Sequence, residues 1–120
     1  MRGPRILVCG SRDWTDTTLI YRWLSLFDPD TIIEGEARGA DQRAAWWAFD
    51  NNVPCMRFPA EWKKYGKAAG PIRNKQMLDE GKPDLVLAFH DDIENSKGTA
   101  DMVEQARKRD ILRLVVSHGV

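Results

Sequence analysis

Three short segments of small residues hold the chemistry that this sequence offers. They are Gly10–Arg12, Gly35–Asp41 and Ser96–Asp101, and each lies between a short apolar run and an amphipathic stretch. Such a position predicts a tight strand-to-helix turn, where backbone N–H groups beside a hydroxyl or an arginine bind phosphate or a similar anion. Three such turns in 120 residues predict one nucleotide-sized pocket.

The first of these turns offers three different groups to a ligand. Gly10 lets the backbone approach closely, and Ser11 can donate its O–H. Arg12 can grip a phosphate or carboxylate through two parallel hydrogen bonds. Asp13 follows directly, so an ion pair between Arg12 and Asp13 is the alternative interpretation.

The second turn places an arginine between two glycines. Gly35 and Gly39 flank Arg38, and Gly39 with Ala40 leaves the N-terminus of the next helix open to an anion. Asp41 has two interpretations, as the N-cap of that helix or as a hydrogen-bond partner of ligand hydroxyls. Arg38 either binds the ligand or is solvated.

A long segment, residues 59–74, follows the third apolar run. Loops of this length at a sheet edge tend to be functional. Trp62 could stack on a base or cover the core. Arg73 and Asn74 fall in the first turn of the next helix, and Arg73 is the strongest candidate for the ligand's charge.

The third turn combines a backbone cradle with a carboxylate. Gly98 and Thr99 precede a helix, and Thr99 can cap it or donate to phosphate. Asp101 lies in the first helical turn, where an acid offsets the helix dipole or acts as a general acid or base.

Composition limits the classes of function. The chain is 42% hydrophobic and 30% charged, as expected for one globular domain spanning residues 1–120. A formal net charge of zero argues against a nucleic-acid partner. No apolar run is long enough to span a membrane, and the short run Ile6–Cys9 is no signal peptide, so we expect a cytoplasmic protein. Cys9 and Cys55 are interpreted as buried side chains, and no spacing indicates a metal site or a cofactor.

Apolar and amphipathic stretches alternate along the whole chain. This alternation predicts a Rossmann-like, doubly wound α/β fold, a single domain with about five parallel strands in the order 3-2-1-4-5. The ligand site of such a fold lies where the strand order reverses, between the first and fourth strands. The predicted strands are 5–9, 31–33, 55–58, 85–89 and 112–116, and the predicted helices are 17–27, 41–51, 70–81 and 99–109.

The second predicted helix is apolar nearly all round. It reads Ala44-Ala45-Trp46-Trp47-Ala48-Phe49, although a surface helix needs only one apolar stripe. Because tryptophan favours subunit interfaces, we expect a homodimer formed through the Trp46/Trp47 helix.

Four motifs, taken together, carry a specific resemblance. They are Gly-Ser-Arg-Asp at 10–13, Gly-Glu-Ala-Arg-Gly-Ala-Asp at 35–41, Ala-Gly-Pro-Ile-Arg-Asn-Lys-Gln-Met at 69–77 and Gly-Thr-Ala-Asp at 98–101. In this order they resemble the YspA-type branch of the SLOG superfamily, which also contains the Lonely Guy cytokinin-activating hydrolases. The resemblance implies a Rossmann-like domain that binds a nucleotide or nucleotide-derived small molecule, as a sensor, sequestering or processing domain.

The alternative function is N-ribosidic hydrolysis of nucleoside monophosphates. Lonely Guy enzymes use an arginine in an Arg-Lys-x-x-Met helix and a glutamate after Gly-Gly-x-Gly-Thr. Arg73, with Met77 four residues later, resembles the first element, and Asp101 stands where the glutamate would be. The resemblance thus implies Arg73 and Asp101 as catalytic residues, but the shorter acid is displaced by about one methylene, and a shift near 1 Å can cost about 100-fold in rate.

Overall fold

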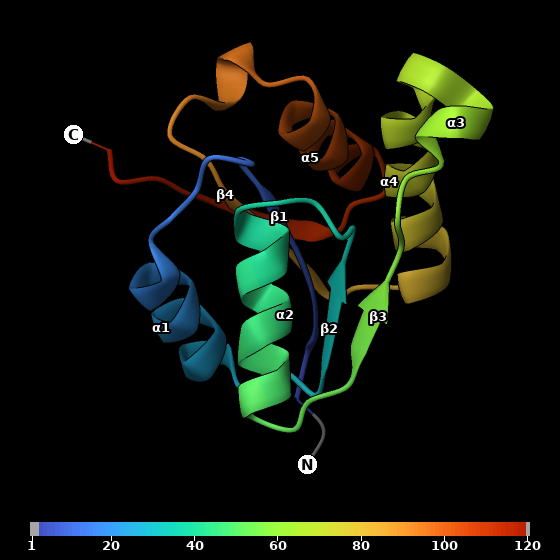
Figure 1. Cartoon of the computed structure of the whole chain (residues 1–120). Helices are drawn as coiled ribbons and strands as arrows, with labels where there is room; N and C mark the ends of the chain where they lie inside the picture. Colours follow the sequence, from blue (N-terminus) through green and yellow to red (C-terminus); the bar gives the residue numbers. More distant parts are fainter. Residues whose placement is uncertain (1–2, 120) are drawn as a thin grey trace.

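The computed structural model describes residues 3–119 as a parallel sheet with helices on both faces (Figure 1). The strands are β1 (Arg5–Gly10), β2 (Thr31–Glu34), β3 (Cys55–Arg57), β4 (Leu85–Phe89) and β5 (Leu112–Val116). The helices are α1 (Thr17–Phe27), α2 (Ala40–Asp50), α3 (Trp62–Tyr65), α4 (Ala69–Gly81) and α5 (Gly98–Lys108), with short 3₁₀ turns η1 (Gly66–Ala68) and η2 (Ile93–Asn95).

The strand order is β3-β2-β1-β4-β5, as the sequence predicts, and all neighbouring pairs are parallel. In the centre of the sheet Leu7 pairs with Ile33 of β2 on one side and Val86 of β4 on the other. The chain first winds outward from β1 to β3 and then returns to β4 on the opposite side of β1. The carboxyl ends of β1 and β4 therefore flank the crevice in which ligands of this architecture bind.

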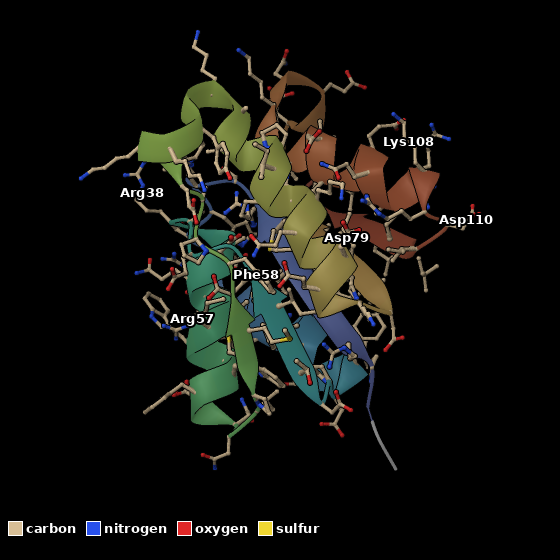
Figure 2. All side chains as sticks on the ribbon, turned by 90° about the vertical axis from the view of Figure 1, so that its right-hand side faces the viewer. Arg38, Arg57, Phe58, Asp79, Lys108 and Asp110 are labelled. Atoms are coloured by element: carbon tan, nitrogen blue, oxygen red, sulfur yellow. The ribbon has the colours of Figure 1, made fainter. Side chains whose placement is uncertain are left out.

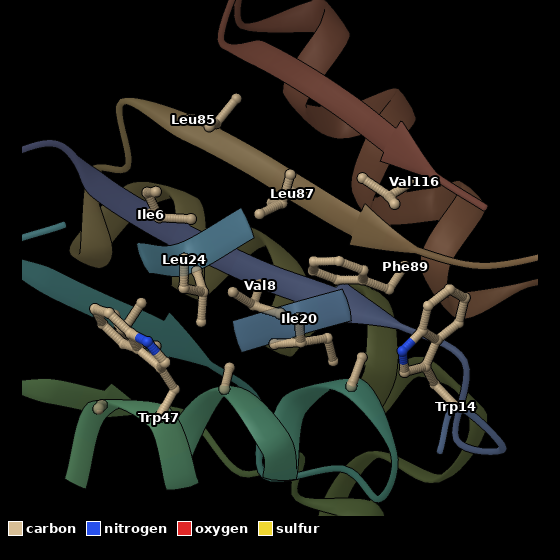
Figure 3. Packing of buried hydrophobic residues seen from close by; sticks show 14 residues of the cluster. Ile6, Val8, Trp14, Ile20, Leu24, Trp47, Leu85, Leu87, Phe89 and Val116 are labelled. Atoms are coloured by element: carbon tan, nitrogen blue, oxygen red, sulfur yellow. The ribbon is translucent and has the colours of Figure 1, made fainter. Parts of the chain in front are cut away.

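Alternate residues of β1 enter two separate apolar cores. Ile6 and Val8 pack with α1 and α2, whereas Leu7 and Cys9 pack with α4 and α5. Figure 3 shows the first core, where Leu24 of α1 lies against the sheet. The centre of β1 is apolar because it is buried on both faces. The carboxyl end of this strand, Cys9 and Gly10, lines the crevice.

Several boundaries differ from the sequence prediction by one residue, and one predicted loop is partly helical. The third strand ends at Arg57, one residue early, because Phe58 leaves the sheet while its N–H still bonds to the Glu34 carbonyl at 2.9 Å. The predicted loop of residues 59–69 contains α3 and η1. The helix after it begins at Ala69, before the Gly70-Pro71 pair. This short helical segment is the part of the crevice wall that the periodicity did not reveal.

The α2 helix buries Trp47 and exposes its neighbours. Trp47 is 3% exposed, and its indole N–H donates to Ser25 Oγ at 3.1 Å. Trp46 and Phe49 are 44% and 83% exposed. The two apolar sides of α2 therefore differ: Trp47 belongs to the core between α2 and the sheet, whereas Trp46 and Phe49 face outward, and the homodimer stays a prediction.

Candidate ligand-binding site

A cavity of about 620 Å³ lies at the carboxyl ends of β1 and β4. Its walls come from the turn after β1, the α3–η1 segment, and the first turns of α4 and α5. This volume falls in the range of small-molecule sites, and the position is the point where the strand order reverses.

Nine of the predicted site residues line this one cavity. They are Gly10, Ser11, Arg12, Asp41, Trp62, Arg73, Asn74, Gly98 and Thr99. Five others do not line it: Gly35, Arg38, Gly39, Ala40 and Asp101. Figure 2 shows Arg38 at the outer margin of the molecule, where it is exposed to solvent.

The turn after β1 is held tightly against β4. The Ser11 N–H donates to the Phe89 carbonyl at 2.9 Å, and Ser11 Oγ accepts the Asp13 N–H at 3.0 Å. A Cβ on Gly10 would lie 2.2 Å from the Phe89 oxygen and 2.9 Å from Ala40 Cβ. Gly10 is thus required by packing, and the Ser11 hydroxyl keeps its own proton to donate.

Cations outnumber carboxylates around the cavity. Arg12, Lys67, Arg73 and Lys97 line it, and the Arg12 guanidinium carbon lies 5.7 Å from the Trp62 ring centre. Trp62 is 49% exposed and forms an aromatic wall beside these charges. Within residues 3–119 only Asp13 and Asp41 contribute carboxylates to the lining, so the cavity favours an anion with an aromatic or apolar part.

The Arg73 guanidinium is fixed by two partners. Its Nη1 donates to the Gly35 carbonyl at 2.6 Å, and its Nε donates to Asn74 Oδ1 at 3.1 Å. A Cβ on Gly35 would lie 2.2 Å from this Nη1. Gly35 is therefore a supporting residue that gives Arg73 its place, and not a residue of the cavity wall.

Asn74 connects Arg73 to the start of α5. Its Nδ2 donates to the Gly98 carbonyl at 3.2 Å and to Asp101 Oδ2 at 3.0 Å. The same Asp101 oxygen accepts from Gln105 Nε2 at 2.8 Å. Asp101 thus lies behind Asn74, outside the cavity lining, with its carboxylate engaged by two amides.

The interpretation of Asp41 as a helix N-cap is wrong. The N-cap of α2 is Gly39, which has φ 76° and makes no side-chain cap. The Asp41 carboxylate, in the first turn, instead accepts the N–H of Gly35 at 2.9 Å and that of Ala37 at 3.4 Å. Burial raises the pKa of Asp41 to about 6, although nearby Arg73 opposes the shift.

Sequence reasoning missed a second buried acid at this edge. Glu34 is 1% exposed, accepts the Glu36 N–H through Oε1, and lies 3.5 Å from Arg57 Nε through Oε2. Burial raises the pKa of Glu34 to about 7. Burial and the neighbouring Asp41 carboxylate also raise the pKa of the Cys9 thiol, which keeps Cys9 protonated at neutral pH.

Ten further residues line the cavity and were not named as site residues, although Ala37, Ser96 and Lys97 belong to the turns that were predicted to meet there. Two others could have been found from the sequence. The basic run from Lys63 to Lys75 indicates Lys67, and the position directly after β4 indicates His90. The additional lining residues are Cys9, Asp13, Ala37, Lys67, Gly70, Pro71, Met77, His90, Ser96 and Lys97. Between residues 3 and 119, no cluster of acids, histidines and cysteines could hold a metal, and no helix is long and apolar enough to cross a membrane.

Comparison with known proteins identifies the family. The model of the YspA, cpYpsA-related SLOG family (YAcAr) matches residues 4–65, which include the turns after β1 and β2. The chain belongs to the YspA, cpYpsA-related SLOG family. The Gene 61 protein of Mycobacterium phage D29 is 35% identical to this SLOG protein over 119 residues, covering 89% of this chain and 91% of the phage protein.

A solved structure confirms the architecture of this SLOG protein. DNA processing protein A (DprA) from Streptococcus pneumoniae superposes with a TM-score of 0.72 and covers 96% of the chain. The sequence identity is 18%, so the likeness shows the fold, and the chain spans 50% of the length of that protein.

Proposed function

We propose that this SLOG protein binds a nucleotide or nucleotide-derived small molecule in the 620 Å³ cavity, as a sensor, sequestering or processing domain. The observation that carries the proposal is that Arg12, Arg73 and the Gly98–Thr99 turn line one hollow, although they are far apart in sequence. Family membership supports a nucleotide-related ligand in general.

Each wall of the cavity offers a role to part of such a ligand. Arg12 and Arg73 are suited to phosphate, because guanidinium groups bind it through paired hydrogen bonds. Trp62 offers an aromatic face to a base. Ser11 and Thr99 add hydroxyl groups from two separate turns. The base and the phosphate of one nucleotide would then be bound in the same cavity.

A thermal-shift panel of mono-, di- and cyclic nucleotides and dinucleotides tests the proposal. A ligand at 100 times its Kd stabilises the protein by about 2.7 kcal/mol. We expect Arg73→Ala to abolish the shift. The matched control is Arg38→Ala, which removes an exposed arginine outside the cavity. A panel with no stabilising nucleotide, or equal loss in both variants, contradicts the proposal.

Hydrolysis of an N-ribosidic bond is less well supported than binding. Its proposed acid, Asp101, lies outside the cavity lining and is bonded to Asn74 and Gln105. We therefore expect no free base after long incubation of nucleoside monophosphates with the protein. Base release that is lost in Asp101→Asn would establish the hydrolase instead.

The DNA-processing neighbour also raises an oligonucleotide as a ligand. Zero net charge argues against it. Retention of single-stranded oligonucleotides that falls steeply with salt would favour nucleic acid over a small nucleotide.

We further propose a cytoplasmic homodimer formed through the outer face of α2. Exposed Trp46 and Phe49 support the interface, and the free thiols of Cys9 and Cys55 accord with a reducing compartment. Light scattering should give twice the mass of the chain, and Phe49→Ser should yield a monomer. Leu26→Ser is the control, because Leu26 is 75% exposed and lies on a different helix, α1. Subcellular fractionation tests the cytoplasmic location.

A further inference from the structure

The backbone under Arg73 is held by a buried carboxylate. Asp41 Oδ2 accepts N–H groups from both Gly35 and Ala37, at 2.9 and 3.4 Å. The carbonyl of the same Gly35 receives Arg73 Nη1 at 2.6 Å. Asp41 is 4% exposed, yet its side chain reaches the lining of the cavity. A single short loop thus joins the Asp41 carboxylate to Arg73, the cation that we propose binds the ligand.

A second carboxylate holds the same loop from the other side. Glu34 Oε1 accepts the Glu36 N–H, while Glu34 Oε2 lies 3.5 Å from Arg57 Nε and 3.8 Å from Cys55 Sγ. The Asp41 charge disfavours the ionised form of Glu34 and so raises the pKa of Glu34. The loop is therefore anchored by two acids that are mutually repulsive when both are ionised.

The charges that face Asp41 come from three further elements. Burial opposes the ionised form of Asp41, whereas Arg73 on α4 and Arg12 after β1 favour it. The Asp41 charge in turn raises the pKa of Glu34 in β2. The Cys9 thiol of β1 is also close enough to interact with the Asp41 charge, and it is neutral. Burial outweighs the two arginines, so the pKa of Asp41 is raised to about 6.

We infer that Asp41 is a positioning residue that acts through the 35–37 backbone on Arg73, and that an anion bound at Arg73 is taken up together with a proton on Asp41. The inference rests on the proposed anion site. It changes the role expected for Asp41, from a partner of ligand hydroxyls to a proton acceptor linked to binding.

The physical reason is the shared lining of Asp41 and Arg73. An anion in the cavity brings a like charge toward the Asp41 carboxylate and also competes for the guanidinium that compensates it. Both effects favour the protonated acid. Below pH about 5 the acid is already protonated and affinity is independent of pH. Above pH about 6 affinity falls as pH rises, approaching tenfold per pH unit for one proton.

Inorganic sulfate is the probe, because it stays a dianion from pH about 5 to about 8.5 and adds no titration of its own. Calorimetry at several pH values, in two buffers of different ionisation enthalpy, gives both Kd and the number of protons taken up. The variants are Asp41→Asn, which keeps a carbonyl oxygen to accept from Gly35, and Arg73→Ala. Glu36→Gln is the matched control, since it neutralises an exposed acid of the same loop.

We expect proton uptake in the wild type and in Glu36→Gln, and none in Asp41→Asn. Asp41→Asn should bind sulfate as the wild type does at pH about 5 and at least about tenfold more tightly at pH about 8, because the repelling charge is gone. Circular dichroism and a melting curve show whether the variant is folded. A residue with a merely structural role would weaken binding equally at every pH.

The outcomes separate this inference from the proposed function. Arg73-dependent sulfate binding with no proton uptake, or with the same uptake in Asp41→Asn, overturns the inference and leaves the nucleotide site standing. Sulfate binding that is unaffected by Arg73→Ala also overturns it. Proton-linked sulfate binding without any nucleotide response supports the role of Asp41 and contradicts the nucleotide ligand.

Discussion

The turn before α5 and the turn between β2 and α2 share a composition but differ in use. A Cβ on Gly98 would meet no atom within 4 Å, so this glycine faces open space beside the cavity. A Cβ on Gly35 would strike Arg73 Nη1 at 2.2 Å, and one on Gly39 would strike the Ser11 carbonyl at 2.1 Å. One turn is a wall for a ligand, and the other is a tightly packed support beneath it. A glycine in the sequence thus marks either an opening or a close approach.

The largest expected effect comes from substituting the supporting glycine with the least room. Gly39→Ala places a Cβ against backbone at a φ of 76°, where no side-chain rotation relieves the clash. We expect a loss of about 2–4 kcal/mol of stability, measured by chemical denaturation. Gly98→Ala, in open space at the start of α5, should change stability by less than about 1 kcal/mol. Equal losses of stability in the two variants would contradict the distinction between an open turn at Gly98 and a tightly packed turn at Gly39.

The fold follows from the sequence because its signals are local and repeated. The apolar run of β1 and the helical spacing of α1 each predict their own element, and right-handed crossovers between neighbouring strands are consistent with the observed strand order. The same topology brings Arg12, Arg73 and Thr99 to one cavity, since all three follow the carboxyl ends of strands or begin helices there. Their roles in ligand binding remain predictions.

The support beneath the site could not be predicted in the same way. Glu34 ends a strand, where a carboxylate is ordinarily solvated, and its burial depends on the packing of β3 and the loop beside it. The link from Asn74 to Asp101 depends on how α4 lies against α5. Such contacts join residues distant in sequence and leave no periodic pattern. The backbone donors of residues 35–37 looked free for a ligand only because their internal acceptors could not be seen.

A smaller effect is expected at Gly35, where the turn between β2 and α2 contacts Arg73 of the cavity lining. Gly35→Ala forces a Cβ into Arg73 Nη1, the flexible end of a side chain, so the arginine moves while the backbone persists. We expect anion affinity to fall at least about tenfold, since one charge-assisted contact is worth about 1.5–3 kcal/mol, with a stability loss below about 1.5 kcal/mol. Titration calorimetry with the strongest nucleotide of the panel measures the first quantity. In Gly98→Ala the affinity should change by less than about threefold, and the reverse order of the two variants would make Gly98 the residue that fixes the anion.

The smallest effect concerns the buried acid under the loop. Because burial raises the pKa of Glu34 to about 7, the folded protein holds a proton that the unfolded chain releases near pH about 4.5. The stability linked to this proton is complete below pH about 4.5 and is lost as pH rises through about 7. Glu34→Gln keeps an oxygen to accept the Glu36 N–H but cannot ionise, so at pH about 8 it should be more stable than the wild type by about 1–2 kcal/mol, after discounting for the attraction of Arg57. Urea denaturation at pH about 5 and about 8 measures the difference. A variant that is equally destabilised at both pH values would show that the Arg57 pair outweighs burial, and the wild-type loop would then be held by a permanently ionised acid.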